Sequence, residues 1–189
     1  MAGSEMKTHK SAVVITPPEE IWEPIQKIRR LYDRQFHRWM PHITLIYPFR
    51  PRSELERAVA VLSSGITALR AFALRLRRLR YFTHGRDRFT MWLDPGPCES
   101  IAAPQAAFQA QVPDCDDVSK FPRGFTPHLS VGQAKGCREL EERTCGIQDQ
   151  WEPLEFTVAD VAIIYRDDDG PFRVERIIPL AHVKEANEA

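Results

Sequence analysis

Short runs of β-favouring residues alternate with helical patterns along most of the chain. The apolar run 12–15 is followed by a double proline and predicts a strand, and apolar residues then recur at helical spacing from Ile25 to Phe36. Ser53-Glu54-Leu55-Glu56 has the pattern of a capping box, which predicts a second helix ending at Gly65. Further strands are predicted over 42–47, 72–82, 89–93, 126–133, 156–166 and 172–178, and further helices over 100–111 and 138–145.

The order of these elements indicates the fold class. They follow one another as β-α-β-α-β-β-α-β-α-β-β, and we expect an α+β, bilobal molecule. Each of two similar lobes would be an antiparallel sheet with helices on its outer face, and a central cleft would separate them. Within the strand predicted over 72–82 the alternation slips between Arg77 and Arg78, which indicates a bulge or an edge strand.

Two five-residue segments share the pattern Pro-His-aliphatic-hydroxyl-aliphatic. They are Pro41-His42-Ile43-Thr44-Leu45 and Pro127-His128-Leu129-Ser130-Val131. Alternate side chains of a strand point to opposite faces, so each strand would present an imidazole and a hydroxyl on one face and aliphatic groups on the other. Two such strands side by side would bring together His42, Thr44, His128 and Ser130. The alternative is an old duplication that is retained only for packing.

Composition bounds the class of protein without identifying it. The chain has 189 residues, of which 43% are hydrophobic and 28% are charged, so it should be globular. The zero net charge argues against a molecule that binds polyanions over its whole surface, although a local basic groove remains possible. The four cysteines lack the spacing of zinc ligands and are expected to be ordinary thiols.

The chain shows no signal peptide and no long apolar run. We therefore expect an intracellular protein, cytoplasmic or nuclear, that does not contact a membrane and is a monomer. We interpret residues 1–10 as a disordered terminus or a cloning remnant, 11–182 as one bilobal domain, and 183–189 as a C-terminal tail. The chain could also be one domain of a longer protein.

Paired histidines suit chemistry at phosphorus. Cleavage of a phosphodiester needs a base on one side and an acid on the other, and the pKa of histidine allows both roles. The hydroxyls of Thr44 and Ser130 could donate hydrogen bonds to the non-bridging oxygens as negative charge develops there. This scheme requires no metal and no cofactor. The sequence does not show which histidine is the acid.

The two motifs resemble those of the 2H phosphoesterase superfamily. The sequences around both motifs are most similar to the 2′-5′ RNA ligase-like branch, which includes cyclic phosphodiesterases. These sequences are Met40-Pro41-His42-Ile43-Thr44-Leu45 and Phe125-Thr126-Pro127-His128-Leu129-Ser130. The resemblance extends from about residue 11 to 180. It implies a bilobal fold with both motif strands lining the cleft, and it implies His42, Thr44, His128 and Ser130 as catalytic residues. Serine replaces the second threonine of many relatives, but both are donors.

Substrate contacts must come from residues outside these motifs. One predicted hairpin carries a cluster of arginines that could follow a nucleic-acid backbone, although charge also protects edge strands. Arg78 and Arg80 are our candidates from this cluster. Tyr165 and Arg166 end a strand beside a turn and are further candidates. Aromatic residues that could stack on bases are Tyr47, Phe49, Tyr81, Phe82, Trp92 and Tyr165, although most aromatics in such strands belong to the core.

Three functions are compatible with the sequence. The first is a metal-independent phosphodiesterase, with RNA or a nucleotide as substrate, that acts on 2′,3′-cyclic phosphates or 2′-5′ linkages by two-histidine acid–base catalysis. The second is a non-catalytic RNA- or nucleotide-binding domain that uses the same cleft. The third is a protein-interaction domain with a vestigial site. Retention of both histidines favours the enzyme, because a binding module does not need two proton-transfer groups.

Overall fold

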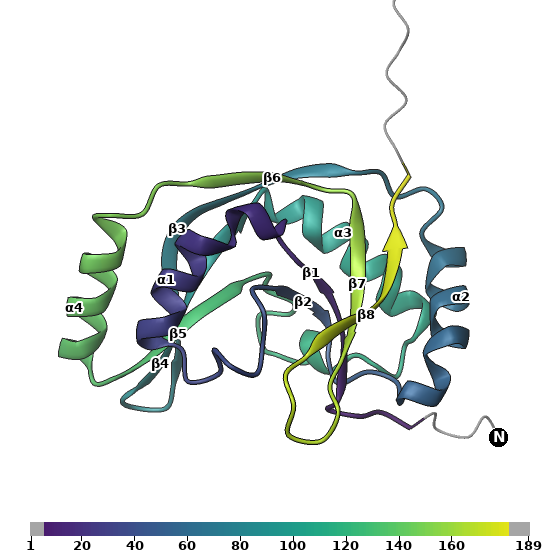
Figure 1. Ribbon diagram of the computed structural model, residues 1–189, viewed down its shortest axis with the longest axis horizontal. Coiled ribbons are helices and arrows are strands. Elements are labelled where there is room, and N and C mark those ends of the chain that lie inside the picture. The colour runs from purple at the N-terminus through teal and green to yellow at the C-terminus, as the bar shows by residue number, and fades with distance from the viewer. Residues whose placement is uncertain (1–5, 182–189) are drawn as a thin grey trace, which may run out of the picture.

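The computed structural model describes residues 6–181 (Figure 1). The strands are β1 (Ser11–Ile15), β2 (Ile43–Ile46), β3 (Phe72–His84), β4 (Arg88–Gly96), β5 (Leu129–Lys135), β6 (Leu154–Val158), β7 (Asp160–Tyr165) and β8 (Arg173–Pro179). The α-helices are α1 (Trp22–Tyr32), α2 (Leu55–Gly65), α3 (Cys98–Gln111) and α4 (Cys137–Gln148), and the 3₁₀ turns are η1 (Glu19–Ile21), η2 (Arg52–Glu54) and η3 (Asp117–Ser119).

The strands form two four-stranded antiparallel sheets, which confirms the predicted α+β bilobal class. One sheet has the order β2-β1-β7-β8 and the other β5-β4-β3-β6. The first sheet is therefore built from both ends of the chain, and the second from its middle. The two edge strands β2 and β5 lie against each other, so the segments that follow the two histidines meet where the lobes join.

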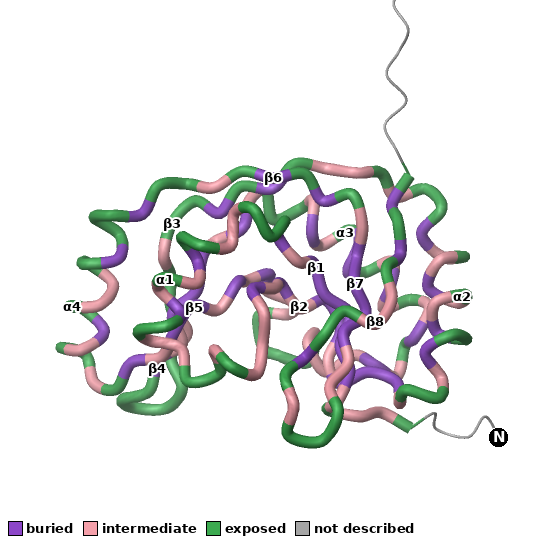
Figure 2. Tube along the Cα trace, viewed as in Figure 1, coloured by how far each residue is buried: buried purple, intermediate pink, exposed green. Residues whose placement is uncertain are grey.

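One apolar core runs through both lobes. It includes Ile43 and Leu45 from β2, Leu129 and Val131 from β5, and Ile25 from α1, none of which is exposed. Residues of α2, α3 and α4 complete it, and α2 and α4 lie at opposite ends of the long axis (Figure 1). Figure 2 shows buried residues concentrated along the central strands, with exposed residues along the outer sides of the helices.

A second, smaller apolar cluster covers the other face of the first sheet. It consists of Ala12 and Val14 from β1, Ala162 and Ile164 from β7, and Phe172. Strand β7 alternates between the two clusters, since Val161 and Ile163 belong to the main core. Both faces of the central strand β1 are thus covered, which explains why every residue of β1 is buried.

The structure divides the strand that we predicted over 156–166. Leu154–Val158 pairs with β3 in the second sheet, whereas Asp160–Tyr165 pairs with β1 and β8 in the first. Ala159 separates the two strands. No glycine or proline marks this transition, but the apolar alternation changes phase here, since Phe156 and Val158 share one parity and Val161 and Ile163 share the other.

The predicted capping box was also wrong. The 3₁₀ turn Arg52–Glu54 precedes α2, and no side chain caps the helix by a hydrogen bond. Ser53 lies inside that turn, where its side chain does not reach the helix N-terminus. The first helix ends at Tyr32, so Phe36 lies beyond it, while Pro24 occupies the first turn as expected.

The phase slip in the third strand was predicted correctly. The pairing of β3 with β4 shifts between Leu76 and Leu79, which brings Leu79 back to the core side. The partner β6 pairs only with Phe72–Leu76. Strand β3 is therefore central in its first half and borders no further strand of residues 6–181 in its second half.

The described structure can be compared with the predicted domain boundaries at its N-terminal end only. Thr8 exchanges backbone hydrogen bonds with Phe49, so the described structure begins before the strand predicted from residue 11. The predicted tail 183–189 lies outside the described residues. Across residues 6–181, none of the helices has the length and apolar character that crossing a membrane requires.

Candidate active site

Both motif histidines stand immediately before a strand. His42 precedes β2 and His128 precedes β5, and each is half-buried. The hydroxyl residues Thr44 and Ser130 are also half-buried, whereas the aliphatic residues between and after them are fully buried. The predicted separation of chemical and core faces is thus confirmed for both motifs.

Each imidazole is held by the same backbone hydrogen bond. Nδ1 of His42 lies 2.7 Å from the carbonyl oxygen of Met40, and Nδ1 of His128 lies 2.8 Å from that of Thr126. Because a carbonyl only accepts, both Nδ1 atoms carry hydrogen, and the neutral rings leave Nε2 as the basic atom. The proline between each carbonyl and its histidine restricts the backbone at this turn.

Trp39 covers the imidazole of His42. The two rings stack with centroids 4.7 Å apart, and Trp39 also stacks on Phe172 at 3.8 Å. Burial lowers the pKa of His42 to about 4, although the hydrogen bond to Met40 opposes this effect. The positive charges of Arg29 and His128 contribute to this lowering, and the charge of Asp33 opposes it. The two histidines are therefore close enough for their charges to interact.

His128 lies among aromatic side chains of the second sheet. The ring of Phe82 meets it edge-to-face at 4.9 Å, and the ring of Trp92 lies 6.0 Å away. Burial lowers the pKa of His128, against the hydrogen bond to Thr126. Phe82 and Trp92 were among the aromatics suggested by the sequence, and here they border the histidine.

The hydroxyls of Thr44 and Ser130 make no hydrogen bond to any other described residue. Both are half-buried and share a strand face with their histidines. Ser130 is paired with Trp92 across β4 and β5, which fixes its place in the sheet. The site therefore combines two imidazoles whose Nε2 atoms have no described partner with two hydroxyls free to donate. This set can transfer protons on two sides of a phosphate and bind its oxygens.

An arginine that sequence reasoning missed holds the segment that leads to His42. Arg29 is 1% exposed and its guanidinium donates to Asp33 at 2.8 Å, to Gln26 at 3.0 Å and to the carbonyl of Trp39 at 2.7 Å. It thereby ties the last turn of α1 to the loop that carries the tryptophan beside His42. A single arginine at helical spacing from an aspartate gives no sequence signal for this role.

The structure separates the two candidates at the end of β7. Arg166 lies on the same side as Phe172, with its guanidinium carbon 5.7 Å from that ring, and its buried Nε has no hydrogen-bond partner within residues 6–181. Tyr165 faces the main core and lies under Arg52 at 5.2 Å. Only Arg166 is therefore brought towards the stack that covers His42.

Arg78 and Arg80 lie on the site face of the second sheet. Arg80 is paired with Trp92, which in turn is paired with Ser130, so these three share one face. Two strand spacings separate Arg80 from Ser130, about 10 Å. Both arginines share the carboxylate of Asp94, at 2.7 Å from Arg80 and 3.5 Å from Arg78.

Other aromatics fall on either side of the first sheet. Phe49 has the strand parity of Ile43 and Leu45 and is fully buried in the main core. Tyr47 has the same parity, but it packs with the second cluster and meets Trp39 edge-to-face at 5.4 Å. A register shift between β1 and β2 explains the change, because Val13 pairs with Ile46 but Val14 pairs with Thr44.

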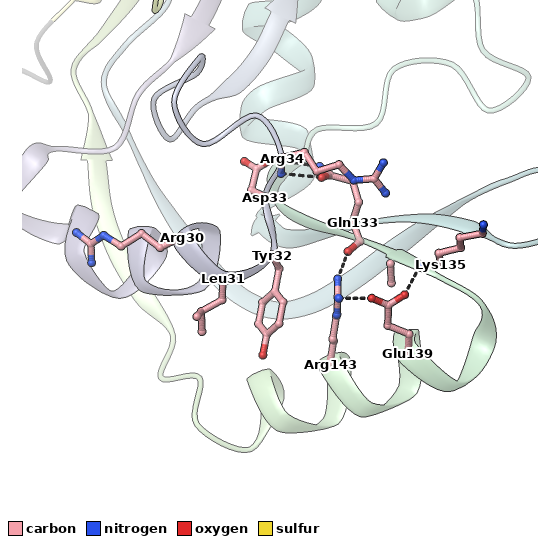
Figure 3. A pocket seen from close by; sticks show the side chains of 10 residues that line it. Arg30, Leu31, Tyr32, Asp33, Arg34, Gln133, Lys135, Glu139 and Arg143 are labelled. Carbon is pink, nitrogen blue, oxygen red and sulfur yellow. Dashed lines mark hydrogen bonds and ion pairs between the residues drawn. The ribbon is translucent and has the colours of Figure 1, made fainter.

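A cavity of about 310 Å³ lies beside the site, between the end of α1, β5 and α4 (Figure 3). Its lining residues are Arg30, Leu31, Tyr32, Asp33, Arg34, Gln133, Ala134, Lys135, Glu139 and Arg143. None of the four motif residues lines it. Within residues 6–181, no three histidine, cysteine, aspartate or glutamate side chains are grouped so that they could hold a metal ion.

The family model of the 2′-5′ RNA ligase superfamily matches residues 17–170. This range is most of the chain, so the protein belongs to the 2′-5′ RNA ligase superfamily, and the resemblance inferred from the two motifs is confirmed. No curated protein matches the sequence.

Solved structures support the same fold. TT0787 of Thermus thermophilus is similar with a TM-score of 0.62 and 20% identity, over 92% of this chain and 98% of that one. LigT of E. coli in apo form has a TM-score of 0.59 and 18% identity, over 93% and 99%. LigT complexed with 3′-AMP has a TM-score of 0.57 and 17% identity over the same shares.

Proposed function

We propose that this protein is a metal-independent phosphodiesterase that acts on RNA ends or nucleotides carrying a 2′,3′-cyclic phosphate or a 2′-5′ linkage. The observation that carries the proposal is the matched pair of imidazoles. Each is fixed through Nδ1 to a backbone carbonyl two residues upstream, and each leaves Nε2 without a partner among the described residues. Membership of the superfamily and the nucleotide bound in the LigT structure support it.

In the proposed reaction, Nε2 of one neutral imidazole takes a proton from water. The water oxygen forms a bond to phosphorus, and the bond from phosphorus to the departing ribose oxygen breaks. The other imidazole, protonated at Nε2, gives its proton to that oxygen. Thr44 and Ser130 donate to the non-bridging oxygens, where charge increases in the transition state. The two histidines exchange roles when the reaction runs in reverse.

Substrate binding favours uptake of the proton that this scheme requires. The pKa of both histidines is lowered by burial, so the free protein holds mostly neutral imidazoles at neutral pH. A bound phosphodiester places negative charge between them, which favours protonation of one ring. The protein therefore binds its anionic substrate together with the proton that the leaving group requires.

The arginines around the site are proposed to contact the rest of the substrate. Arg166 borders the Trp39–Phe172 stack, and its buried Nε is unpartnered within the described chain. Arg78 and Arg80 lie on the face that carries Ser130. Tyr165 is not among the proposed substrate contacts, because its ring faces the main core.

The test measures hydrolysis in the presence of a chelator. Two substrates are compared, a short RNA ending in a 2′,3′-cyclic phosphate and a 2′-5′-linked oligoadenylate. We expect turnover of at least one, with a loss of at least about 100-fold in His42→Ala and in His128→Ala.

The rival function is a non-catalytic RNA- or nucleotide-binding domain. Binding without turnover of either substrate would support it and contradict the enzyme. Turnover that survives in the double variant His42→Ala/His128→Ala would show that the activity comes from a contaminant. Retained binding by that variant would show that it still folds.

A further inference from the structure

The cavity beside the site is a candidate for binding a second part of the substrate. Two of its cationic side chains are already engaged, since Arg30 pairs with Glu23 and Arg143 pairs with Glu139. Its carboxylates are neutralised as well, because Asp33 pairs with the buried Arg29. These charged side chains are therefore neutralised by their partners and contribute little attraction for a charged ligand.

Two cations of the wall remain without a counter-ion. The charged groups of Arg34 and Lys135 form no ion pair or hydrogen bond with any residue of 6–181, and both side chains are exposed. Figure 3 shows Arg34 beside the amide of Gln133, which accepts from the Arg34 backbone N–H at 3.0 Å and donates to Asp33 at 3.1 Å. The cavity thus presents two uncompensated positive charges on a wall held by hydrogen bonds.

An apolar residue stands next to these charges. Leu31 lines the cavity and is 69% exposed, which is high for a leucine. A volume of about 310 Å³ is at the lower end of the range for small-molecule sites. Cations beside an exposed apolar surface match the chemistry of a nucleotide, which carries an anionic phosphate and an uncharged base.

Two structural links connect this cavity to the histidines. Gln133 follows Ser130 by three residues on β5, which is about 10 Å along a strand. On the other side, one guanidinium, that of Arg29, bonds both Asp33 in the cavity wall and the carbonyl of Trp39, whose ring stacks on His42. A phosphate between the histidines and one beside Arg34 could therefore belong to the same short strand.

We infer that the cavity binds the phosphate of a neighbouring nucleotide in an RNA strand, through Arg34 and Lys135. This inference rests on the proposed function and makes it more specific, because it assigns an oligonucleotide as the preferred substrate. A mononucleotide cyclic phosphate has no second phosphate for Arg34 and Lys135 to bind.

The experiment compares the variant Arg34→Ala/Lys135→Ala with the wild-type protein on two substrates. These are adenosine 2′,3′-cyclic phosphate and an RNA hexamer that ends in a 2′,3′-cyclic phosphate. We expect kcat/KM for the hexamer to fall by about 10-fold or more, mainly through KM, while the value for the mononucleotide is unchanged. Arg138→Ala is the matched control, because Arg138 is an exposed arginine of α4 outside the cavity lining.

Salt dependence gives a second readout that does not depend on catalysis. Binding of a labelled RNA hexamer is measured by fluorescence anisotropy at several salt concentrations. Each lost phosphate contact should reduce the slope of log affinity against log salt by about 0.7 for a single strand. The wild-type slope should therefore be steeper than that of the double variant and equal to that of Arg138→Ala.

The outcomes separate this inference from the proposed function. If the wild type hydrolyses neither substrate, the proposed function fails, and the anisotropy measurement still decides whether the cavity binds RNA. If both substrates are hydrolysed and the double variant matches the wild type on the hexamer in rate and in salt slope, the inference is overturned. An equal loss on both substrates also overturns it, since the change would then act on the site as a whole.

Discussion

At the scale of single residues, the two motifs share one device for orienting an imidazole. The carbonyl of the residue before each proline accepts the Nδ1 hydrogen of the histidine after it. Because both partners lie within three consecutive residues, local backbone geometry alone fixes the tautomer of each ring. The aromatic neighbours differ, since His42 is stacked on Trp39 and His128 is met by the edge of Phe82.

Thr44→Val tests the proposed role of the hydroxyl. Valine keeps the shape of threonine and its preference for strands but cannot donate a hydrogen bond. We expect kcat for a cyclic phosphate substrate to fall by about 100-fold, as when one donor to a developing anion is removed. Stability should change by less than about 1 kcal/mol, because the hydroxyl has no partner among the described residues. Thr44→Ser is the control and should retain most of the activity, and equal activity in all three proteins would exclude the role.

Trp39→Leu tests whether the stacked indole sets the protonation of His42. Removing the ring lets water reach the imidazole, so the pKa of His42 should rise from about 4 towards its ordinary value of 6.5. An NMR titration of the histidine ring protons measures this value directly. Trp39→Phe keeps an aromatic cover and should give an intermediate or unchanged pKa. A pKa in Trp39→Leu that stays near 4 would show that other groups desolvate the ring.

At the scale of elements, the site depends on how a helix is joined to a loop. The last turn of α1 supplies Arg29, whose guanidinium reaches the carbonyl of Trp39 ten residues later. Burial lowers the pKa of Arg29, and the charge of Asp33 opposes this shift. The arginine is thus a buried cation that is stable only with its partners in place. The position of Trp39 over His42 is therefore connected to the packing of α1.

Arg29→Leu should destabilise the protein strongly. Removing one member of a buried ion pair leaves the other charge without a partner, which costs about 3–5 kcal/mol. Urea unfolding, followed by circular dichroism, measures the change in the free energy of unfolding. Arg30→Ala removes the neighbouring arginine, whose pair with Glu23 is exposed, and should leave the unfolding midpoint almost unchanged. Similar midpoints for Arg29→Leu and Arg30→Ala would refute the structural role.

At the scale of the whole molecule, the sequence predicted what local patterns encode. The order of the elements predicted the fold class, the paired motifs predicted the alternation of faces, and the slipped alternation predicted the bulge in β3. The split of 156–166 between two sheets was not predicted: the alternation slips at Asp160, but pairing partners far along the chain decide which sheet each half joins. Phe172 is distant in sequence from Trp39, so their stacking has no local pattern.

The stability of the whole molecule should fall on acidification between pH 6.5 and 4. The pKa of His42 is about 4 in the folded protein and about 6.5 when the chain is unfolded, so in this range the unfolded chain binds the additional proton. Lowering the pH therefore favours unfolding, by about 3 kcal/mol in total, and the loss is complete below pH 4. Urea midpoints measured at pH 7, 5.5 and 4.5 test this.

His42→Asn is the control, because it removes the titrating group while keeping a side-chain N–H for the Met40 carbonyl. Its unfolding midpoint should depend less on pH over this range. An identical dependence in both proteins would show that His42 is not the group responsible. The depressed pKa of Asp114, which follows from its hydrogen bond to Arg50, acts at lower pH, because a carboxyl of this kind loses its contribution only as it becomes protonated.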